Sequence, residues 1–337
     1  MKAVGYRNSL PITDAQSLID VEVPVPVPGA RDLLVEVKAV SVNPVDTKVR
    51  MRAAPEPGGI KVLGWDAAGV VKAIGSSVTL FKPGDDVFYA GSIARAGTNS
   101  ERHLVDERIT ALKPRSLNFA QAAALPLTSI TAWELLFDRL GIVRGDAQRK
   151  GSLLIIGGAG GVGSIMIQLA RRLTGLIVIA TASRPESRDW VLKLGAHHAV
   201  DHSKPLADEV RSLGIQQVEF VASLTNSEQH LAQVAELIAP QGRYGIIDDP
   251  KTFDVMLFKR KSVSLHWELM FTRAVFETPD MIEQHRLLVK VAEMVDAGSI
   301  RTTLSEDFGP INAANLRRAH ALIESGRSTG KIVLSGF

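Results

Sequence analysis

A glycine-rich turn near the middle of the chain has the residue types and spacing for the most specific chemistry. The segment LLIIGGAGGVGSIMIQLARRL runs from a short apolar strand pattern through this turn into an amphipathic helix pattern. Gly158 would allow a tight turn, Gly160 would let a pyrophosphate approach the backbone, and Gly163 would let helix and strand pack closely. The helix would begin near Gly161 and Val162, whose N–H groups could bind phosphate. Because a strand precedes and a helix follows, we predict dinucleotide binding rather than a purely structural turn.

The residues after the next apolar run indicate which dinucleotide would bind. Sites selective for NAD place an Asp or Glu at this point, against the ribose hydroxyls. This sequence instead has Ser183 and Arg184, followed by Arg188. A guanidinium can pair with a 2′-phosphate through two parallel hydrogen bonds, so we predict NADPH as the cofactor. The alternative is that both arginines are exposed charges at the start of a helix.

Composition excludes several other kinds of site. The 337 residues include no Cys, which rules out disulfides, a cysteine nucleophile, iron–sulfur clusters and zinc sites built from thiolates. The eight histidines show no His-x-x-x-His pair with a nearby carboxylate. The formal net charge is only +3, and the basic run 259–261 has no interleaved aromatic residues, which argues against a nucleic-acid partner. No apolar run is long enough for a signal-peptide core or a membrane span, so we predict a cytoplasmic protein without a membrane partner.

The elements that position these groups fall into two patterns. Up to about residue 120, short runs with period-two alternation are separated by Pro and Gly, which predicts a mostly antiparallel β-domain with strands at 33–42, 67–75 and 86–91. Beyond it, wholly apolar strands alternate with helical patterns, which predicts a doubly wound parallel sheet. The expected strands are 152–157, 176–183, 218–224 and 242–248, and the expected helices lie near 161–173, 185–194, 204–213 and 228–238.

The fold class predicted is therefore α/β, with one β-rich and one dinucleotide-binding domain. We place the β-rich domain at 1–124 and 300–337 and the dinucleotide-binding domain at 125–299. The C-terminal KIVL segment, 331–334, is expected to pair with the sheet of the first domain.

Six segments resemble a known family: SVNPVDTKVR, VLGWDAAGVV, FKPGDDVFYAG, LPLTSITAWELL, GGAGGVG and GKIVL. Together they resemble the medium-chain dehydrogenase/reductase superfamily, in its zinc-free quinone oxidoreductase branch, along essentially the whole chain. Two further segments, DDPKTFDVMLFKRKSVSLHWELMFTR and AHALIESGRSTGKIVL, are similar to a bacterial subgroup named zinc-type alcohol dehydrogenase-like. The resemblance implies a GroES-like catalytic domain, a Rossmann domain, a cleft between them and a homodimer, with 266–271 as a candidate dimer strand.

The same resemblance bears on the metal. Zinc-dependent members carry a Cys and a His in the two N-terminal motifs, together with a later Cys or acidic residue. Here the loop from Asn43 to Asp46 stands at the first position and Trp65 at the second, so both expected ligands are missing. We therefore predict no metal site.

The resemblance also implies roles for individual residues. Asn43 and Asp46 occupy the active-site loop, where they would contact substrate or nicotinamide, and Arg50 would orient Asp46. Asp46 would be a poor acid unless burial raised its pKa. Tyr89 is a candidate hydrogen-bond donor near the expected cleft. The structural alternatives are a turn at Asn43, a helix N-cap at Asp46 and a half-buried strand aromatic at Tyr89. The positions matched to the cofactor side are Thr131, His202, Asn226, Ile247, Asp248, Trp267 and Lys331.

These expectations lead to one function and two alternatives. Without a metal as Lewis acid, reduction of a quinone or an activated C=C bond is less demanding than alcohol chemistry. We therefore expect an NADPH-dependent reductase of quinones or α,β-unsaturated carbonyl compounds. The alternatives are a zinc-dependent alcohol dehydrogenase and a non-catalytic protein that binds NADPH or RNA.

Overall fold

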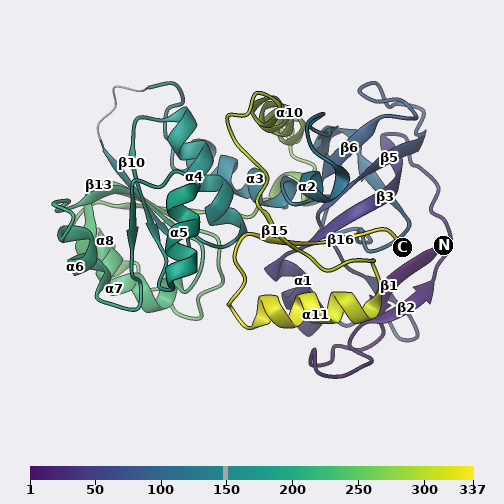
Figure 1. Ribbon diagram of the computed structural model, residues 1–337, viewed down its shortest axis with the longest axis horizontal. Helices are drawn as coiled ribbons and strands as arrows, with labels where there is room; N and C mark the ends of the chain where they lie inside the picture. Colours follow the sequence, from purple (N-terminus) through teal and green to yellow (C-terminus); the bar gives the residue numbers. More distant parts are fainter. Residues whose placement is uncertain (147–150) are drawn as a thin grey trace. The chain divides into compact units, whose positions relative to one another are not determined.

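The chain forms two compact units in the computed structural model, which describes residues 1–146 and 151–337 (Figure 1). The first unit comprises Met1–Ile130 and Phe271–Phe337, and the second comprises Thr131–Met270. No helix among the described residues has the length and apolar character needed to cross a membrane.

The first unit is built on two β-sheets, as expected for a GroES-like domain. A seven-stranded sheet has the order β15-β16-β3-β5-β6-β8, with β7 also paired to β3. Its strands are β3 (Asp32–Val42), β5 (Ala67–Ile74), β6 (Asp86–Tyr89), β7 (Arg102–Asp106), β8 (Thr110–Leu112), β15 (Leu304–Asp307) and β16 (Lys331–Ser335). A smaller antiparallel sheet joins β1 (Lys2–Tyr6), β2 (Ile19–Glu22) and β4 (Lys61–Val62). The prediction that 331–334 joins this domain's sheet is confirmed, because β16 pairs antiparallel with β3.

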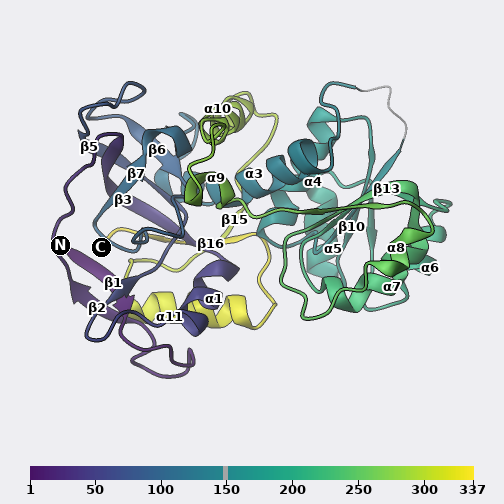
Figure 2. The same cartoon turned by 180° about the vertical axis from the view of Figure 1, so that it is seen from behind.

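Helices and short turns surround these sheets, as Figure 2 shows from the opposite side. They are α1 (Pro44–Arg52), the 3₁₀ turn η1 (Glu107–Ile109), α2 (Phe119–Ala123), α9 (Thr272–Val275), α10 (Glu283–Asp296) and α11 (Ala313–Glu324), while α3 (Pro126–Trp133) contains the boundary between the units.

Segment 271–299 belongs to the first unit, which differs from the predicted division at residue 300. The contacts of α10 explain the difference. His285 Nδ1 lies 2.6 Å from the carbonyl oxygen of Thr110, and the Asp296 carboxylate accepts a 2.9 Å hydrogen bond from the Ser116 N–H. An amphipathic pattern predicts that a helix covers a sheet, but it does not say which sheet.

The second unit is a Rossmann-type parallel sheet with the strand order β11-β10-β9-β12-β13-β14. All five strand pairs are parallel, and the order is the 3-2-1-4-5-6 arrangement of dinucleotide-binding folds. The strands are β9 (Ser152–Ile156), β10 (Ile177–Thr181), β11 (His198–Val200), β12 (Val218–Ser223), β13 (Ile238–Ile246) and β14 (Ser264–Trp267). The helices are η2, a π-helical segment (Glu134–Arg139), α4 (Gly161–Leu173), α5 (Pro185–Lys193), α6 (Leu206–Arg211), α7 (Ser227–Leu237) and α8 (Met256–Lys259).

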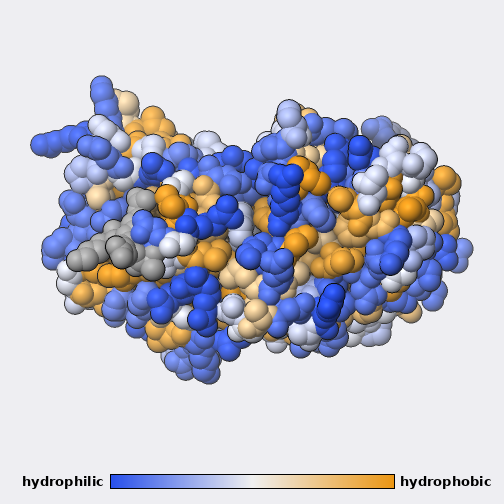
Figure 3. All heavy atoms as spheres, turned by 90° about the horizontal axis from the view of Figure 1, so that it is seen from above, coloured by the Kyte–Doolittle hydropathy of each residue, from blue (hydrophilic) through white to orange (hydrophobic). Residues whose placement is uncertain are grey.

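Burial explains why the sequences of these strands are continuous apolar runs. All five residues of β9 are buried, because strands of a covered parallel sheet face protein on both sides. The core around Leu154, Ile179 and Val221 continues to Val234 on α7. Hydrophobic residues on one face of the surface are scattered between hydrophilic ones (Figure 3), which is ordinary for a folded protein. The strand β13 begins at Ile238, earlier than the predicted residue 242, because the chain passes directly from α7 into it.

A buried pair of carboxyl groups lies in the second unit. Glu134 begins η2 and Glu268 follows β14, and both side chains are fully buried. Arg139 Nε donates to Glu268 Oε2 at 2.8 Å. Its Nη2 lies 4.0 Å from Glu134 Oε2, so one guanidinium group faces both carboxyl groups. Burial, followed by the negative charge of Glu134, raises the pKa of Glu268 to about 9. The folded protein therefore favours a protonated Glu268.

This raised pKa predicts how Glu268→Gln changes the pH dependence of stability. An acid with a raised pKa in the folded state loses stability as pH rises from its unfolded pKa toward its folded pKa. Glutamine stays neutral, so the variant should gain stability relative to wild type between about pH 5 and about pH 8. Chemical denaturation at the two pH values measures the difference, and Glu186→Gln, at an exposed position on α5, is the control. An unchanged or growing disadvantage of Glu268→Gln across this range would contradict the prediction.

Candidate functional site

The glycine-rich turn connects β9 to α4 in the second unit. Gly157 has φ = +86°, which is the left-handed backbone that glycine adopts without strain. Its N–H donates to Thr181 Oγ1 at 3.0 Å, and the Gly158 N–H donates to the Thr181 carbonyl at 3.1 Å. The residue that makes the tight turn is therefore Gly157, not Gly158 as predicted. The available signal was that Gly157 is the first residue after the apolar strand pattern.

The other glycines differ in how much room surrounds them. A Cβ at Gly158 would lie 2.7 Å from the Cβ of Ala180. A Cβ at Gly163 would lie 2.5 Å from the carbonyl oxygens of both Gly157 and Gly158. Beside Gly160 the closest atom would be 3.6 Å away, which is an ordinary contact. Close packing therefore requires Gly163, whereas the space beside Gly160 is open to a ligand.

The start of α4 presents N–H groups at this open space. Gly160 is the N-cap residue, and the helix begins at Gly161 and Val162. The first N–H groups of a helix have no acceptor within the helix, and the positive end of its dipole favours anions. This part of the turn can therefore bind a pyrophosphate.

Two alanine substitutions separate packing from cofactor binding at this turn. Gly163→Ala should destabilise the second unit by about 1–3 kcal/mol, because two carbonyl oxygens would have to move. Gly160→Ala should leave the unfolding free energy close to that of wild type and weaken NADPH binding. Chemical denaturation and a fluorescence titration with NADPH measure the two effects. Equal losses of stability in both variants would contradict this division of roles.

Ser183 and Arg184 lie just beyond the carboxyl end of β10, before α5. Arg184 has extended backbone geometry, and its N–H donates to Ser187 Oγ at 3.2 Å. Arg188 follows one helical turn later, and residues four apart share a helix face. His202 Nδ1 lies 3.1 Å from Thr181 Oγ1, and burial, with a smaller contribution from the Arg184 charge, lowers its pKa. Arg184 and His202 thus lie at the same corner of the sheet.

The remaining predicted cofactor residues of this unit follow the carboxyl ends of other strands, apart from Thr131, which is buried in α3. Asn226, after β12, is exposed and has φ = +52°. Ile247 and Asp248 follow β13, and Trp267 ends the edge strand β14 with 58% of its surface exposed. In a doubly wound sheet, ligands bind outside the carboxyl ends of the strands.

The Asp248 carboxylate already has partners. It accepts a 2.9 Å hydrogen bond from the Ser227 N–H and another from the Ser227 hydroxyl. The Ser227 hydroxyl has one proton, so it accepts from the Ser223 hydroxyl at 2.7 Å. Asp248 therefore caps the N-terminus of α7. The sequence reasoning missed Ser223 and Ser227, for which the position of Ser227 at a helix start was the only signal.

A buried polar cluster lies in the first unit, formed by Asn43, Asp46, Asp66 and Lys331. Asn43 Nδ2 donates to Asp66 Oδ2 at 3.0 Å, and Lys331 Nζ lies 3.1 Å from the same oxygen. Lys331 Nζ also donates to Asn43 Oδ1 and, at 3.0 Å, to the Val42 carbonyl. The N–H of residue 127 donates to Asp66 Oδ1 at 2.9 Å. The cluster unites two of the three predicted catalytic residues, Asn43 and Asp46, with Lys331, which was predicted on the cofactor side, and with Asp66, which was not singled out.

Asp46 is the third residue of α1 and is 2% exposed. Its Oδ2 accepts a 2.6 Å hydrogen bond from the Asn43 N–H, which makes a capping box, while Oδ1 has no hydrogen-bond partner in the part of the chain that the structure describes. Burial raises the pKa of Asp46 to about 7, against the opposing effects of the Asn43 N–H and the Lys331 charge. Asp46 thus has a capping role at N3 rather than at the N-cap, and its other oxygen is left to hold a proton.

Arg50 does not orient Asp46, contrary to the expectation. Its guanidinium is fully buried, donates to the Leu10 carbonyl and pairs with Glu324 at the end of α11. The side chain therefore ties α1 to α11. A four-residue separation on α1 made Arg50 a plausible partner of Asp46 in sequence, but the packing of α11 directs it away.

Tyr89 is fully buried beside His103. The two rings stack with centroids 5.5 Å apart, and the Tyr89 hydroxyl lies 3.2 Å from His103 Nδ1. Burial lowers the pKa of His103 to about 4, so its Nε2–H donates to the Ala96 carbonyl at 2.9 Å and its Nδ1 accepts from Tyr89. Burial also raises the pKa of Tyr89. Its hydroxyl proton is used within this pair.

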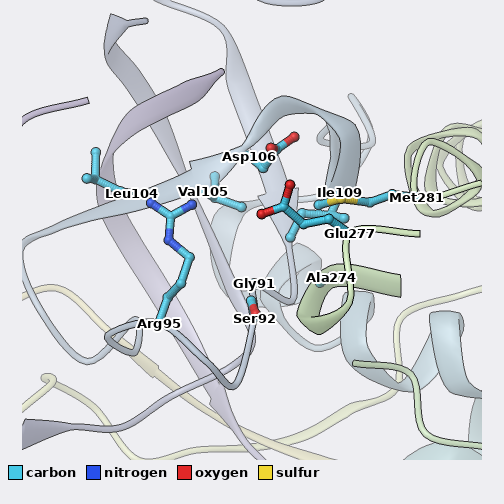
Figure 4. Close-up of a pocket in the computed structure, with 10 residues that line it drawn as sticks. All are labelled: Gly91, Ser92, Arg95, Leu104, Val105, Asp106, Ile109, Ala274, Glu277 and Met281. Atoms are coloured by element: carbon cyan, nitrogen blue, oxygen red, sulfur yellow. The ribbon is translucent and has the colours of Figure 1, made fainter. Parts of the chain in front are cut away.

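Two cavities in the first unit are lined by residues outside the polar cluster. The smaller, of about 50 Å³, contains Arg95, Asp106 and Glu277 in its wall (Figure 4). It is too small for an organic substrate, and Arg95 and Asp106 are paired with Asp32 and Arg108. A larger surface groove of about 640 Å³ lies between 23–26, 60–62 and 93–104. Within 1–146 and 151–337, no group of three or more His, Asp or Glu side chains could hold a metal ion.

Two family matches cover most of the chain. Residues 29–115 match the alcohol dehydrogenase GroES-like domain, and residues 194–334 match the zinc-binding dehydrogenase family. The first match lies in the unit that contains the polar cluster.

Individual relatives agree with these matches. A zinc-type alcohol dehydrogenase-like protein of Staphylococcus aureus strain MSSA476 is 40% identical over 338 residues, covering 99% of this chain and 100% of the relative. The chloroplastic NADPH-dependent alkenal/one oxidoreductase of Arabidopsis thaliana is 38% identical over 314 residues, covering 90% of this chain and 71% of the relative.

Solved structures show the same architecture. A candidate zinc-dependent alcohol dehydrogenase from Rhizobium etli CFN 42 has a TM-score of 0.95 and 62% identity, covering 100% of this chain and 98% of that one. A quinone oxidoreductase from Pseudomonas syringae pv. Tomato DC3000 has a TM-score of 0.83 and 25% identity, covering 99% of each chain.

Proposed function

The chain belongs to the medium-chain dehydrogenase/reductase superfamily of oxidoreductases, and from this premise we propose that it is an NADPH-dependent reductase of quinones or α,β-unsaturated carbonyl compounds that works without zinc. Asp46 is the observation that carries the proposal. Asp46 is a buried carboxylic acid with a pKa of about 7, and one of its oxygens accepts no hydrogen bond from the described residues. General acids work best when their pKa lies near the working pH.

The proposed reaction adds one hydride and one proton to the substrate. NADPH, when bound, supplies the hydride. The electron pair of the attacked C=C or C=O bond then moves toward the conjugated oxygen, and the resulting anion requires a proton. Asp46 gives up the proton held at its carboxyl group and is left as a carboxylate, which solvent reprotonates. The Asn43 side chain, held between Asp66 and Lys331, keeps the start of α1 in place for this transfer.

The residues of the second unit fit NADPH. The open space at Gly160 and the start of α4 suit a pyrophosphate, since a helix N-terminus offers both N–H groups and a positive dipole end. Arg184, and Arg188 one turn later, stand where a carboxylate would favour NAD, so their charges favour a 2′-phosphate. The proposal of NADPH over NADH rests on these two arginines.

The residues of the first unit do not suit Zn²⁺. Both ends of the Asn43 amide are occupied, by Lys331 and by Asp66. The Trp65 indole N–H donates to the Ser92 carbonyl at 3.1 Å and has no lone pair to offer a metal. The Lys331 ammonium group in the same cluster would repel a cation. These contacts support the zinc-free form of the proposal.

A spectrophotometric assay with a panel of quinones and enones tests the activity through the loss of NADPH absorbance. We expect turnover with at least one class, and none with simple alcohols and NADP. Elemental analysis of protein purified without a chelator tests the metal, and about one zinc per chain would contradict the zinc-free mechanism. NADPH binding without turnover, together with salt-sensitive retention of RNA, would favour the non-catalytic alternative.

A further inference from the structure

Among residues 1–146 and 151–337, the hydrogen-bond partners of Lys331 all lie in the first unit. It is 3% exposed, and its ammonium group donates to the Val42 carbonyl, Asn43 Oδ1 and Asp66 Oδ2. A lysine ammonium has three N–H donors, so three acceptors use all of them. The side chain therefore has no donor left for a cofactor unless one of these bonds breaks.

The charges around Asp46 come from two neighbouring elements. Lys331, at the start of β16, contributes a positive charge, and Asp66, just before β5, contributes a negative one. The N–H groups of Asn43 and Gly64 also face the carboxyl group and favour its ionised form. On the same helix, Arg50 is directed to Leu10 and Glu324. The ionised form of Asp46 is thus favoured by Lys331 and disfavoured by Asp66.

From this geometry we infer that Lys331 is a positioning residue, which holds the side chains of Asn43 and Asp66 and sets how readily Asp46 releases its proton. Asn43 is the mechanical link, because its backbone N–H binds Asp46 while its side chain binds Lys331 and Asp66. The catalytic use of that proton rests on the proposed function, whereas its control by Lys331 does not.

Substitutions of opposite sign test the inference. Lys331→Met removes the positive charge and should raise the apparent pKa of Asp46 by about 1 unit or more. Asp66→Asn, which keeps the shape of the side chain, should lower it by a similar amount. The double variant removes both charges and should return the value toward wild type. Lys113→Met is the control. Lys113 binds the Pro114 and Leu117 carbonyls and lies over the Phe119 ring, and it is not part of the polar cluster, so its substitution should leave the titration of Asp46 unchanged.

Three measurements test the role of Lys331. Carbon-13 NMR of protein labelled at aspartate follows the titration of Asp46 without substrate, and Asp46→Asn identifies its signal. The pH profile of kcat should move in the same direction as this titration. The NADPH dissociation constant should not change in any of these variants. A merely structural role of Lys331 would not produce shifts of opposite sign.

Each outcome of these measurements supports or contradicts the inference about Lys331. If Lys331→Met does not fold, because Asp66 is left unpaired, Asp66→Asn and the double variant still supply the comparison. An Asp46 titration that is the same in these variants as in wild type would overturn the inference. Weaker NADPH binding in Lys331→Met without a shift of Asp46 would also overturn it, in favour of a cofactor contact. Opposite NMR shifts in a protein that reduces no quinone or enone would support the inference and contradict the proposed function alone.

Discussion

Asp46→Asn should lower kcat for quinone or enone reduction by about 10²–10⁴-fold, the range for loss of a general acid. Asparagine has the size of aspartate, and its carbonyl oxygen can still accept the 2.6 Å hydrogen bond from the Asn43 N–H. Its amide cannot supply the proton. The unfolding free energy should therefore change far less than kcat, and NADPH binding should be unaffected.

The pH dependence of kcat provides a second test of the role of Asp46. The protonated form of Asp46 is the active one, so wild-type kcat should fall as pH rises through about 7. The variant should lack this limb. Steady-state assays over a range of pH measure both effects, and thermal unfolding checks the fold.

Asp208→Asn is the matched control for Asp46. Asp208 is also the third residue of its helix, α6, but it is exposed and lies in the second unit. Its substitution should leave kcat unchanged. If Asp46→Asn lost stability and kept full activity, Asp46 would be only a capping residue, at a cost of about 1 kcal/mol.

Arg184→Gln should weaken NADPH binding by about 10–100-fold, which corresponds to the loss of charge-assisted hydrogen bonds to the 2′-phosphate. NADH lacks this phosphate, so its dissociation constant should change little. The preference for NADPH should therefore shrink or disappear. Fluorescence titrations with both dinucleotides measure the change directly.

Arg211→Gln is the control for Arg184. Arg211 lies in the same unit and pairs with Glu236 at 2.6 Å, away from the carboxyl edge of the sheet. The Arg211→Gln variant should bind NADPH and NADH with the same dissociation constants as wild type. A uniform loss of NADPH and NADH affinity in Arg184→Gln would show that Arg184 supports the turn rather than the 2′-phosphate.

Local sequence patterns were sufficient for much of the second unit. The helix predicted at 161–173 is α4 with the same bounds, and the strand predicted at 152–157 differs from β9 by one residue. Apolar periodicity and glycine spacing are local properties, so neighbouring residues contain the information. The predicted domain boundary at residue 300 differs from the structure, because local patterns do not show which sheet a helix covers. The position of α10 depends on contacts such as that of His285 with Thr110, 175 residues apart.

The sequence by itself determined the superfamily, the two kinds of domain, the glycine-rich turn between strand and helix, and the absence of thiolate chemistry. It did so because residue type, hydrophobic period and glycine spacing act over a few residues. Only the tertiary structure decided that Gly157 makes the turn, that Arg50 points away from Asp46, and that Lys331 closes the polar cluster. Lys331 and Asn43 are 288 residues apart in sequence. The pKa of Asp46 is raised by its own burial, which the Asn43 N–H and the Lys331 charge oppose. Burial and charge balance are properties of the packed chain, which no local pattern specifies.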